Sequence, residues 1–349
     1  MLKKHFKKKI VLAAVVVAAL YFFWPGFSVQ KAVPRYAEIL VEEFGDQSTA
    51  KLNVIGVEPH LEPTDFASAA HLEIKLSSYL EAARENGLLR PDTLVLFPAH
   101  VGTGLLAAGH KSRTYEAGTI SSALTPIISY NLAQFGKNYY IFDAPNKRVA
   151  AAIRAQSQAA AEAINAVFSA LAQKYGVTIV AGSGLLMTPG IYPDGLTYGH
   201  GPIFHTSFVF TPDGKPLVDA VRQIEPSDAE SAVTEPSLAE FLPIFTAGGT
   251  NYGVAIGADA SRDDVTDHYM AEDVSLILSP QFNKREDPVE YPFGPTPRYK
   301  WGMAVSMKGL GWGLSAQGRT ALIVDGEPIS VQNDDMVGRI YNLWVSPKR

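Results

Sequence analysis

Short, continuous apolar runs alternate along this chain with longer segments in which apolar residues recur at helical spacing. The runs expected to form strands are Leu52–Val57, Thr93–Phe97, Val177–Val180, Phe204–Phe210, Leu276–Leu278 and Thr320–Val324. Spacings of three and four residues predict helices between them, most clearly over residues 67–83 and 149–175. Continuously apolar strands separated by helices are typical of an α/β fold whose sheet is covered by helices.

The N-terminus follows a different pattern. Five lysines within residues 1–9 precede the apolar run Ile10–Trp24, which Pro25 ends. With Phe27 the run approaches the about 17–25 residues that a membrane-spanning helix needs, and the lysines predict its first end in the cytoplasm. We therefore predict a single-pass cell-membrane anchor at residues 10–27 and a main domain outside the cytoplasm. An uncleaved or cleaved signal peptide is the alternative, although no small-residue cleavage pattern follows the run.

The remaining chain is expected to fold as one domain. Residues 1–9 would form a basic cytoplasmic tail and residues 28–51 a spacer. The domain would span residues 52–335, and residues 336–349 would be a C-terminal extension. No repeat, low-complexity tract or shift in composition marks an internal boundary.

Charge and composition exclude several classes of function. The 349 residues include 30 Lys and Arg and 35 Asp and Glu. Without the five N-terminal lysines, 25 basic residues remain against 35 acidic ones, a net charge of −10 that argues against nucleic acid as a partner. The chain has no cysteine, which excludes disulfides and thiolate metal sites.

Histidines and carboxylates raise the question of a metal. His200, His205, Asp259 and His268 carry side chains of types that suit zinc. However, the chain contains neither H-x-x-x-H nor H-E-x-x-H, the spacings that place two ligands on one helix face. We therefore expect no metal and no cofactor. No G-x-S-x-G sequence is present either, which disfavours serine chemistry.

Several short segments follow one another in an order that resembles the nitrilase (carbon–nitrogen hydrolase) superfamily. They are Val57–Asp65, Leu94–Pro98, Ala172–Ser183, Pro212–Lys215, Gly253–Asp259 and Leu276–Pro280. Together they extend from about Leu52 to Val331. The resemblance implies a four-layer α-β-β-α sandwich, and it makes a homodimer the starting expectation for assembly.

Enzymes of this family use a glutamate as general base, a lysine that stabilises developing charge and a cysteine nucleophile. By the resemblance, the glutamate position is Ala99, the lysine position is Arg222 or Gln223, and the cysteine position is Gly257. Losing one member of such a set can cost as much rate as losing all of it, on the order of 10⁶-fold. The leading hypothesis is therefore a degenerate member without nitrilase catalysis, which binds a small molecule or a protein or serves as a scaffold.

A second hypothesis retains catalysis by an altered mechanism. In it, a hydrolase or acyltransferase acts on amide or acyl substrates through His100 and Arg222. The residues expected to line a pocket are His100, His205, Gln223, Ala258 and Asp259. For Asp259 a structural role, satisfying nearby backbone donors, is the favoured interpretation.

Overall fold

The computed structural model describes residues 10–16, 38–192, 195–217, 219–288, 290–309, 311–333 and 335–346. Residues 10–16 are helical, but most of the predicted anchor at residues 10–27 lies outside the described residues. Among the residues described, no helix combines the length and the apolar character needed to cross a bilayer. The anchor, the cytoplasmic tail and the membrane location therefore stay predictions.

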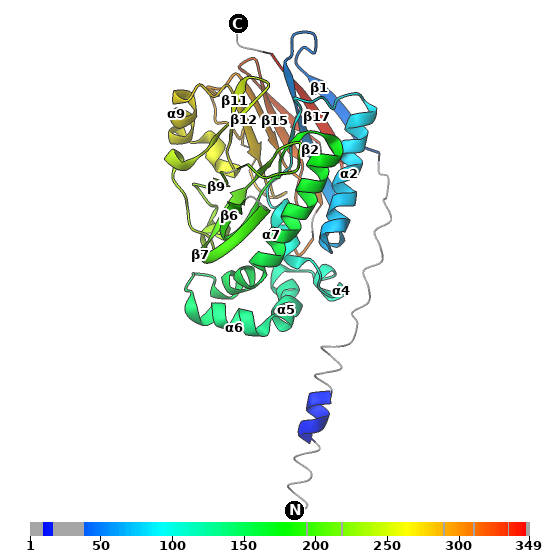
Figure 1. The fold of residues 1–349 in the computed structure, drawn as a ribbon, viewed down its shortest axis with the longest axis vertical. Helices are drawn as coiled ribbons and strands as arrows, with labels where there is room; N and C mark the ends of the chain where they lie inside the picture. Colours follow the sequence, from blue (N-terminus) through cyan, green and yellow to red (C-terminus); the bar gives the residue numbers. More distant parts are fainter. Residues whose placement is uncertain are drawn as a thin grey trace, which may run out of the picture.

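Two six-stranded sheets form the centre of the molecule (Figure 1). In spatial order, the first contains β1 (Leu40–Phe44), β17 (Arg339–Val345), β2 (Leu52–Glu58), β4 (Leu94–Leu96), β5 (Thr178–Val180) and β8 (Val209–Phe210). In spatial order, the second contains β10 (Ile244–Ala247), β11 (Thr250–Val254), β12 (Leu276–Pro280), β13 (Trp301–Val305), β15 (Arg319–Val324) and β16 (Glu327–Gln332). Strands β2, β4 and β5 are parallel, as are β11, β12 and β13, so each trio ends at one edge of its sheet.

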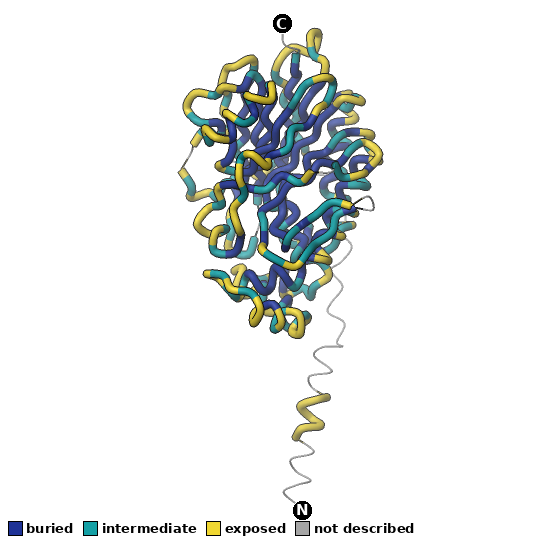
Figure 2. The backbone as a smooth tube through the Cα atoms, turned by 60° about the vertical axis from the view of Figure 1, so that its left-hand side comes forward, coloured by how far each residue is buried: buried dark blue, intermediate teal, exposed yellow. Residues whose placement is uncertain are grey.

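The hydrophobic core has two parts because side chains alternate between the faces of each strand. Val54 and Leu96 of the first sheet share one buried cluster with Val254 and Met303 of the second. The neighbouring position Ile55 belongs to the other cluster, beneath helices α2 (Ala69–Glu85) and α7 (Lys147–Tyr175). Figure 2 shows this buried backbone at the centre of the molecule. The two sheets thus face one another, and helices cover the outer side of the first.

The second sheet and the remaining chain carry smaller elements. Helix α9 (Asp263–Ala271) packs on β11, where the Tyr269 hydroxyl donates to the Val254 carbonyl at 2.8 Å. A three-stranded sheet consists of β6 (Gly184–Tyr192), β7 (Gly195–Ser207) and β9 (Val221–Arg222), and a two-stranded one of β3 (His60–Leu61) and β14 (Lys308–Gly309). The short helices are η1 (Pro63–Phe66), α3 (Val101–Gly104), η2 (Leu105–Ala107), α4 (Ser112–Tyr115), α5 (Ile120–Tyr130), α6 (Leu132–Ile141), α8 (Asp228–Ser231), η3 (Ala239–Phe241) and η4 (Gly257–Ser261).

The mixed α/β class agrees with the sequence, but two predicted domain limits are wrong. The expected spacer, residues 28–51, contains β1, and the expected C-terminal extension, residues 336–349, contains β17. Strand β17 lies between β1 and β2 in the first sheet, and all seven of its residues are buried. The strand also carries Arg339 and Asn342, which are polar but buried, so its sequence does not read as a continuous apolar run. The folded domain therefore includes both of these strands.

One predicted strand is divided between two sheets. Residues 204–210 were expected to form one strand, but β7 ends at Ser207 and β8 begins at Val209. The first part pairs with β6 and β9, whereas the second pairs with β5 of the central sheet. The chain therefore passes from the small sheet to the central sheet at this point, which brings β7 next to the ends of the parallel strands.

A buried ion pair links β2 to β14 within this framework. Lys308 Nζ lies 3.1 Å from Glu58 Oε1, and each side chain is only 1% exposed. Thr320 Oγ1 donates to the other Glu58 oxygen at 2.9 Å, and Lys308 also donates to the Val337 carbonyl at 3.1 Å. Removing one partner of such a pair leaves a charge that is buried and uncompensated.

We expect Lys308→Met to lower the free energy of unfolding by about 3–5 kcal/mol, because Glu58 loses its counter-ion inside the core. The matched control is Lys300→Met, which breaks a solvent-exposed pair with Asp325 at 3.2 Å. That change should cost less than about 1 kcal/mol. Urea unfolding of the purified variants at pH 7 measures both values, and equal losses would contradict the prediction.

Candidate functional site

The three positions that the resemblance assigns to catalysis converge at the ends of strands. Ala99 follows β4, Gln223 follows β9, and Gly257 follows β11 at the start of η4. Gln281 connects two of them, because its Nε2 donates to the Gly257 carbonyl at 2.9 Å and its carbonyl accepts from the Ala99 amide at 3.1 Å. A Cβ atom built on Gly257 would lie 3.2 Å from Gln223 Nε2. The site is therefore formed by side chains far apart in sequence.

Strand alternation separates the two candidates for the lysine position. On β9, the Arg222 guanidinium lies 4.3 Å from the ring centroid of Phe204 and donates to the Pro189 carbonyl at 3.3 Å. The next side chain, Gln223, faces the other way and contacts His205. Gln223 is thus the residue beside Gly257, and Arg222 makes its contacts with the β6–β7 hairpin. A mechanism that pairs Arg222 with His100 gains no support from these contacts.

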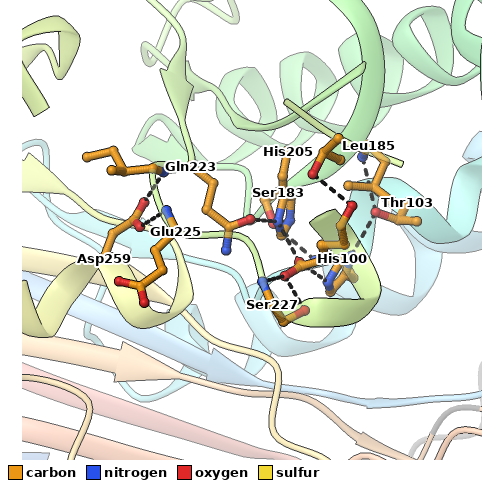
Figure 3. A network of polar contacts seen from close by, with 12 residues as sticks. His100, Thr103, Ser183, Leu185, His205, Gln223, Glu225, Ser227 and Asp259 are labelled. Atoms are coloured by element: carbon orange, nitrogen blue, oxygen red, sulfur yellow. Dashed lines mark hydrogen bonds and ion pairs between the residues drawn. The ribbon is translucent and has the colours of Figure 1, made fainter. Parts of the chain in front are cut away.

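Two histidines and a glutamate form the most polar part of the site (Figure 3). His100 Nε2 lies 3.1 Å from Glu230 Oε1, and His205 Nδ1 lies 2.8 Å from the same oxygen. The two imidazole rings are stacked, with centroids 4.4 Å apart. We call His100, His205 and Glu230 the histidine–glutamate cluster. His100 and His205 were predicted to line the site, whereas Glu230 was not foreseen.

Local structure explains how Glu230 is presented to the histidines. Ser227 is the N-cap of α8, and Glu230 is the third residue of that helix. The Ser227 amide and hydroxyl both donate to Glu230 Oε2, at 2.8 and 2.6 Å. This capping box holds one carboxylate oxygen and leaves Oε1 for the two rings. The spacing Ser-x-x-Glu can be recognised in the sequence, but it predicts a helix start and says nothing about a functional site.

Hydroxyl groups fix the other nitrogen of each ring. His100 Nδ1 lies 3.0 Å from Thr103 Oγ1, and His205 Nε2 lies 2.6 Å from Ser183 Oγ. These hydroxyls also accept backbone amides, that of Leu185 for Thr103 at 3.2 Å and that of His100 for Ser183 at 3.1 Å. His100 itself has a left-handed backbone with φ of 62°, which turns the chain from β4 into α3. The cluster is therefore held in place from several elements.

The electrostatics of the cluster favour an ionised glutamate and a neutral His100. Burial raises the pKa of Glu230, but hydrogen bonds from His100 and His205 outweigh burial and hold that pKa far below its ordinary value. Burial lowers the pKa of His100, and the neighbouring His205 lowers it further. The neutral His100 ring can then donate its Nε2–H to Glu230 Oε1 and accept the Thr103 hydroxyl proton at Nδ1.

Asp259 and Ala258 occupy the turn beside Gly257. Both carboxylate oxygens of Asp259 accept backbone amides at 2.8 Å, from Ile224 and from Glu225. These bonds tie η4 to the segment that follows Gln223, which agrees with a structural role. Ala258 is exposed, and its carbonyl accepts from the Ser261 hydroxyl at 2.9 Å.

The four residues considered for a metal in the sequence are not all near each other. His205 belongs to the histidine–glutamate cluster, whereas Asp259 binds backbone amides. His200 is exposed on β7, and His268 Nε2 lies 2.9 Å from the Leu242 carbonyl. Within the described part of the chain, the group with metal-ligand geometry is instead His100, His205 and Glu230.

Comparison with known proteins supports the fold. No protein-family model matches the chain, and no curated protein matches it. Among solved structures, a cysteine-to-serine variant of a nitrilase-superfamily amidase from Nesterenkonia AN1 is similar, with a TM-score of 0.52 and 12% identity over 86% of this chain and 93% of that one. A second variant of that amidase, which carries the acetamide moiety of fluoroacetamide on its active-site cysteine, gives a TM-score of 0.52 and 13% identity over 85% and 91%.

These likenesses assign the chain to a class by its architecture. It has the nitrilase, or carbon–nitrogen hydrolase, fold, as its ordered motifs predicted. At 12–13% identity the similarity extends to the fold alone. What the site does must therefore be argued from its own residues.

The buried carboxyl of Asp259 gives the protein a testable pH dependence. Burial raises the pKa of Asp259 from 3.8 to about 6, although the two backbone amides oppose the rise. Because the folded-state value is the higher one, stability linked to this group is complete below pH 3.8 and is lost as the pH rises through about 6. The difference corresponds to about 3 kcal/mol.

In Asp259→Asn this titration is absent. The unfolding free energy of the unmodified protein minus that of the variant should therefore fall by about 2.4 kcal/mol between about pH 4 and pH 7. Asp92→Asn, at an exposed position, is the control and should give a constant difference. Chemical denaturation across this pH range measures both, and a pH-independent difference for Asp259→Asn would refute the assignment.

Proposed function

We propose that this chain is a nitrilase-fold binding protein that does not hydrolyse carbon–nitrogen bonds. Its ligand carries a carbonyl or carboxylate oxygen that accepts a hydrogen bond from Gln223 beside Gly257. The observation that carries the proposal is the burial and hydrogen bonding of the Gln223 side chain. It is 4% exposed, and its Oε1 lies 2.8 Å from His205 Nδ1. Among the described residues, Nε2 has no acceptor, and it lies next to Gly257.

The orientation of the Gln223 amide presents its donor to the space beside Gly257. Because Oε1 contacts His205 Nδ1, Nε2 points towards Gly257, where a ligand oxygen could accept a hydrogen bond from it. Gly257 leaves room for the ligand, because any Cβ there would come within 3.2 Å of Gln223 Nε2. Gly257 also has φ of 60°, a left-handed conformation that glycine adopts without strain. Glycine at this position thus places no side chain against the donor.

The side chains at the three family positions support binding over hydrolysis. Ala99 offers no base, Gln223 is neutral and cannot supply the charge of a lysine, and Gly257 has no nucleophile. A neutral amide donor can still hold and orient a carbonyl group. The structural neighbours are amidases, which makes small amides and their acids the natural first probes.

We expect butyramide or butyrate to bind the full-length protein and to show saturation-transfer NMR signals. Gln223→Leu removes the amide donor at similar volume and should reduce the signal at least fivefold. The matched control is Gln332→Leu, because Gln332 is exposed on β16. Equal signals from Gln223→Leu and the control would rule out Gln223 as the donor.

Hydrolysis through Ser183 is a second candidate, favoured by one specific arrangement. Ser183 Oγ, His205 and Glu230 follow one another with spacings of 2.6 and 2.8 Å, in the order of nucleophile, base and acid. Two observations argue against it. First, Ser183 is only 3% exposed, and its hydroxyl accepts the His100 amide. Second, Ser183 contacts Nε2 of His205 whereas Gln223 contacts Nδ1, so Ser183 lies on the opposite edge of the ring from the proposed ligand.

We therefore expect the protein to hydrolyse neither butyramide nor p-nitrophenyl butyrate faster than its Ser183→Ala variant does. Initial rates measured by ammonia release and by absorbance decide this. Turnover that is present in the unmodified protein and lost in both Ser183→Ala and Glu230→Gln would contradict the binding proposal. It would show instead that the protein is a serine hydrolase. Folding of each variant is checked by its thermal unfolding curve.

A further inference from the structure

The histidine–glutamate cluster places three metal-ligand atoms around one point. His100 Nε2, His205 Nδ1 and a Glu230 oxygen all lie within 4.8 Å of one another. They come from the turn before α3, from β7 and from α8, so the fold brings them together without any ligand spacing in the sequence. Three protein ligands of the imidazole and carboxylate types are what zinc sites with an open fourth position use.

The separations need little change to accept an ion. Ligand atoms around a tetrahedral zinc with bonds of about 2.0–2.1 Å are about 3.3 Å apart. The two nitrogens are now 3.1 and 2.8 Å from Glu230 Oε1. Each of these two separations would therefore have to lengthen by only a few tenths of an ångström. Gln223 Oε1, 2.8 Å from His205 Nδ1, is placed to become a fourth oxygen ligand.

The surroundings suit metal-bound imidazoles as well. A metal-binding histidine usually donates its other ring N–H to an oxygen that fixes the orientation of the ring. Thr103 Oγ1 stands at that position for His100, and Ser183 Oγ does so for His205. A hydroxyl oxygen has two acceptor sites, so each can accept the ring N–H in addition to its backbone amide.

Charge and access also fit a cation. Glu230 supplies a negative charge, and its ion pairs within the described residues are with the two histidines. No Lys or Arg of the described residues forms an ion pair with this carboxylate, so no resident cation competes for it. The side chains of His100 and Glu230 are 20% and 13% exposed, which leaves a route from solvent.

We propose that His100, His205 and Glu230 bind one divalent transition-metal ion of the zinc class. This site and the ligand proposed for Gln223 would share that side chain, since the ion would use its Oε1 and the ligand its Nε2. The sequence favoured no metal, because the three ligands are separated by 105 and 25 residues along the chain. The proposal concerns binding of the ion alone and assigns it no reaction.

The test is calorimetric titration of zinc chloride into the full-length protein after removal of metal with EDTA. We expect one ion per chain. Glu230→Gln and His100→Gln should each weaken binding at least tenfold, whereas His200→Gln, at an exposed position on the same strand as His205, should leave it unchanged. Sub-stoichiometric binding, or binding lost in His200→Gln and retained in Glu230→Gln, would overturn the proposal.

A second measurement does not depend on variants that might misfold. Cobalt(II) added to the unmodified protein should produce the visible absorption of a four-coordinate ion with nitrogen and oxygen ligands, and one equivalent of zinc should abolish it. A spectrum identical to that of aqueous cobalt would refute the site. Neither experiment uses butyramide or butyrate. A negative result for metal binding therefore does not decide whether Gln223 binds a ligand, which the NMR experiment tests separately.

Discussion

Burial of the face between the two six-stranded sheets is the constraint on which the rest of the structure depends. That face is filled from both sides, for example by Val54 against Met303. Gly56 of β2 shows how tightly the sheets approach, because a Cβ there would collide with Met303 and Val305. Once the sheets are fixed face to face, the ends of β4, β5 and β11 have no freedom to separate. The site is assembled at those ends.

The site itself depends on polar contacts that join these strand ends. Asp259 ties η4 to the segment after Gln223, and Gln281 ties the Gly257 turn to Ala99. Glu230 holds the two imidazole rings together. Buried polar groups of this kind stabilise a structure only when each finds a partner. Gln223 Nε2 is different because it lies beside Gly257 and makes no hydrogen bond within the described residues, which is why the proposed ligand is placed there.

The positions that the resemblance assigns to catalysis lie close to the histidine–glutamate cluster. Gln223 Oε1 lies 2.8 Å from His205 Nδ1, and Gln223 Nε2 would lie 3.2 Å from a Cβ built on Gly257. Gln223 therefore links the turn at Gly257 to the titratable side chains of the cluster. A fold that retains its strand ends can exchange one set of polar groups for another without altering its sheets.

The sequence by itself determined the α/β class and the order of most strands and helices. Those features depend on local periodicity and on short motifs, which act within a few residues. Only the tertiary structure decided that β1 and β17 belong to the sheet, that Gln223 and not Arg222 faces the site, and that Glu230 joins His100 and His205. Strand pairing determines the first two, and the third is a contact between residues up to 130 positions apart. No local pattern encodes a meeting of side chains that arises only when distant strand ends pack together.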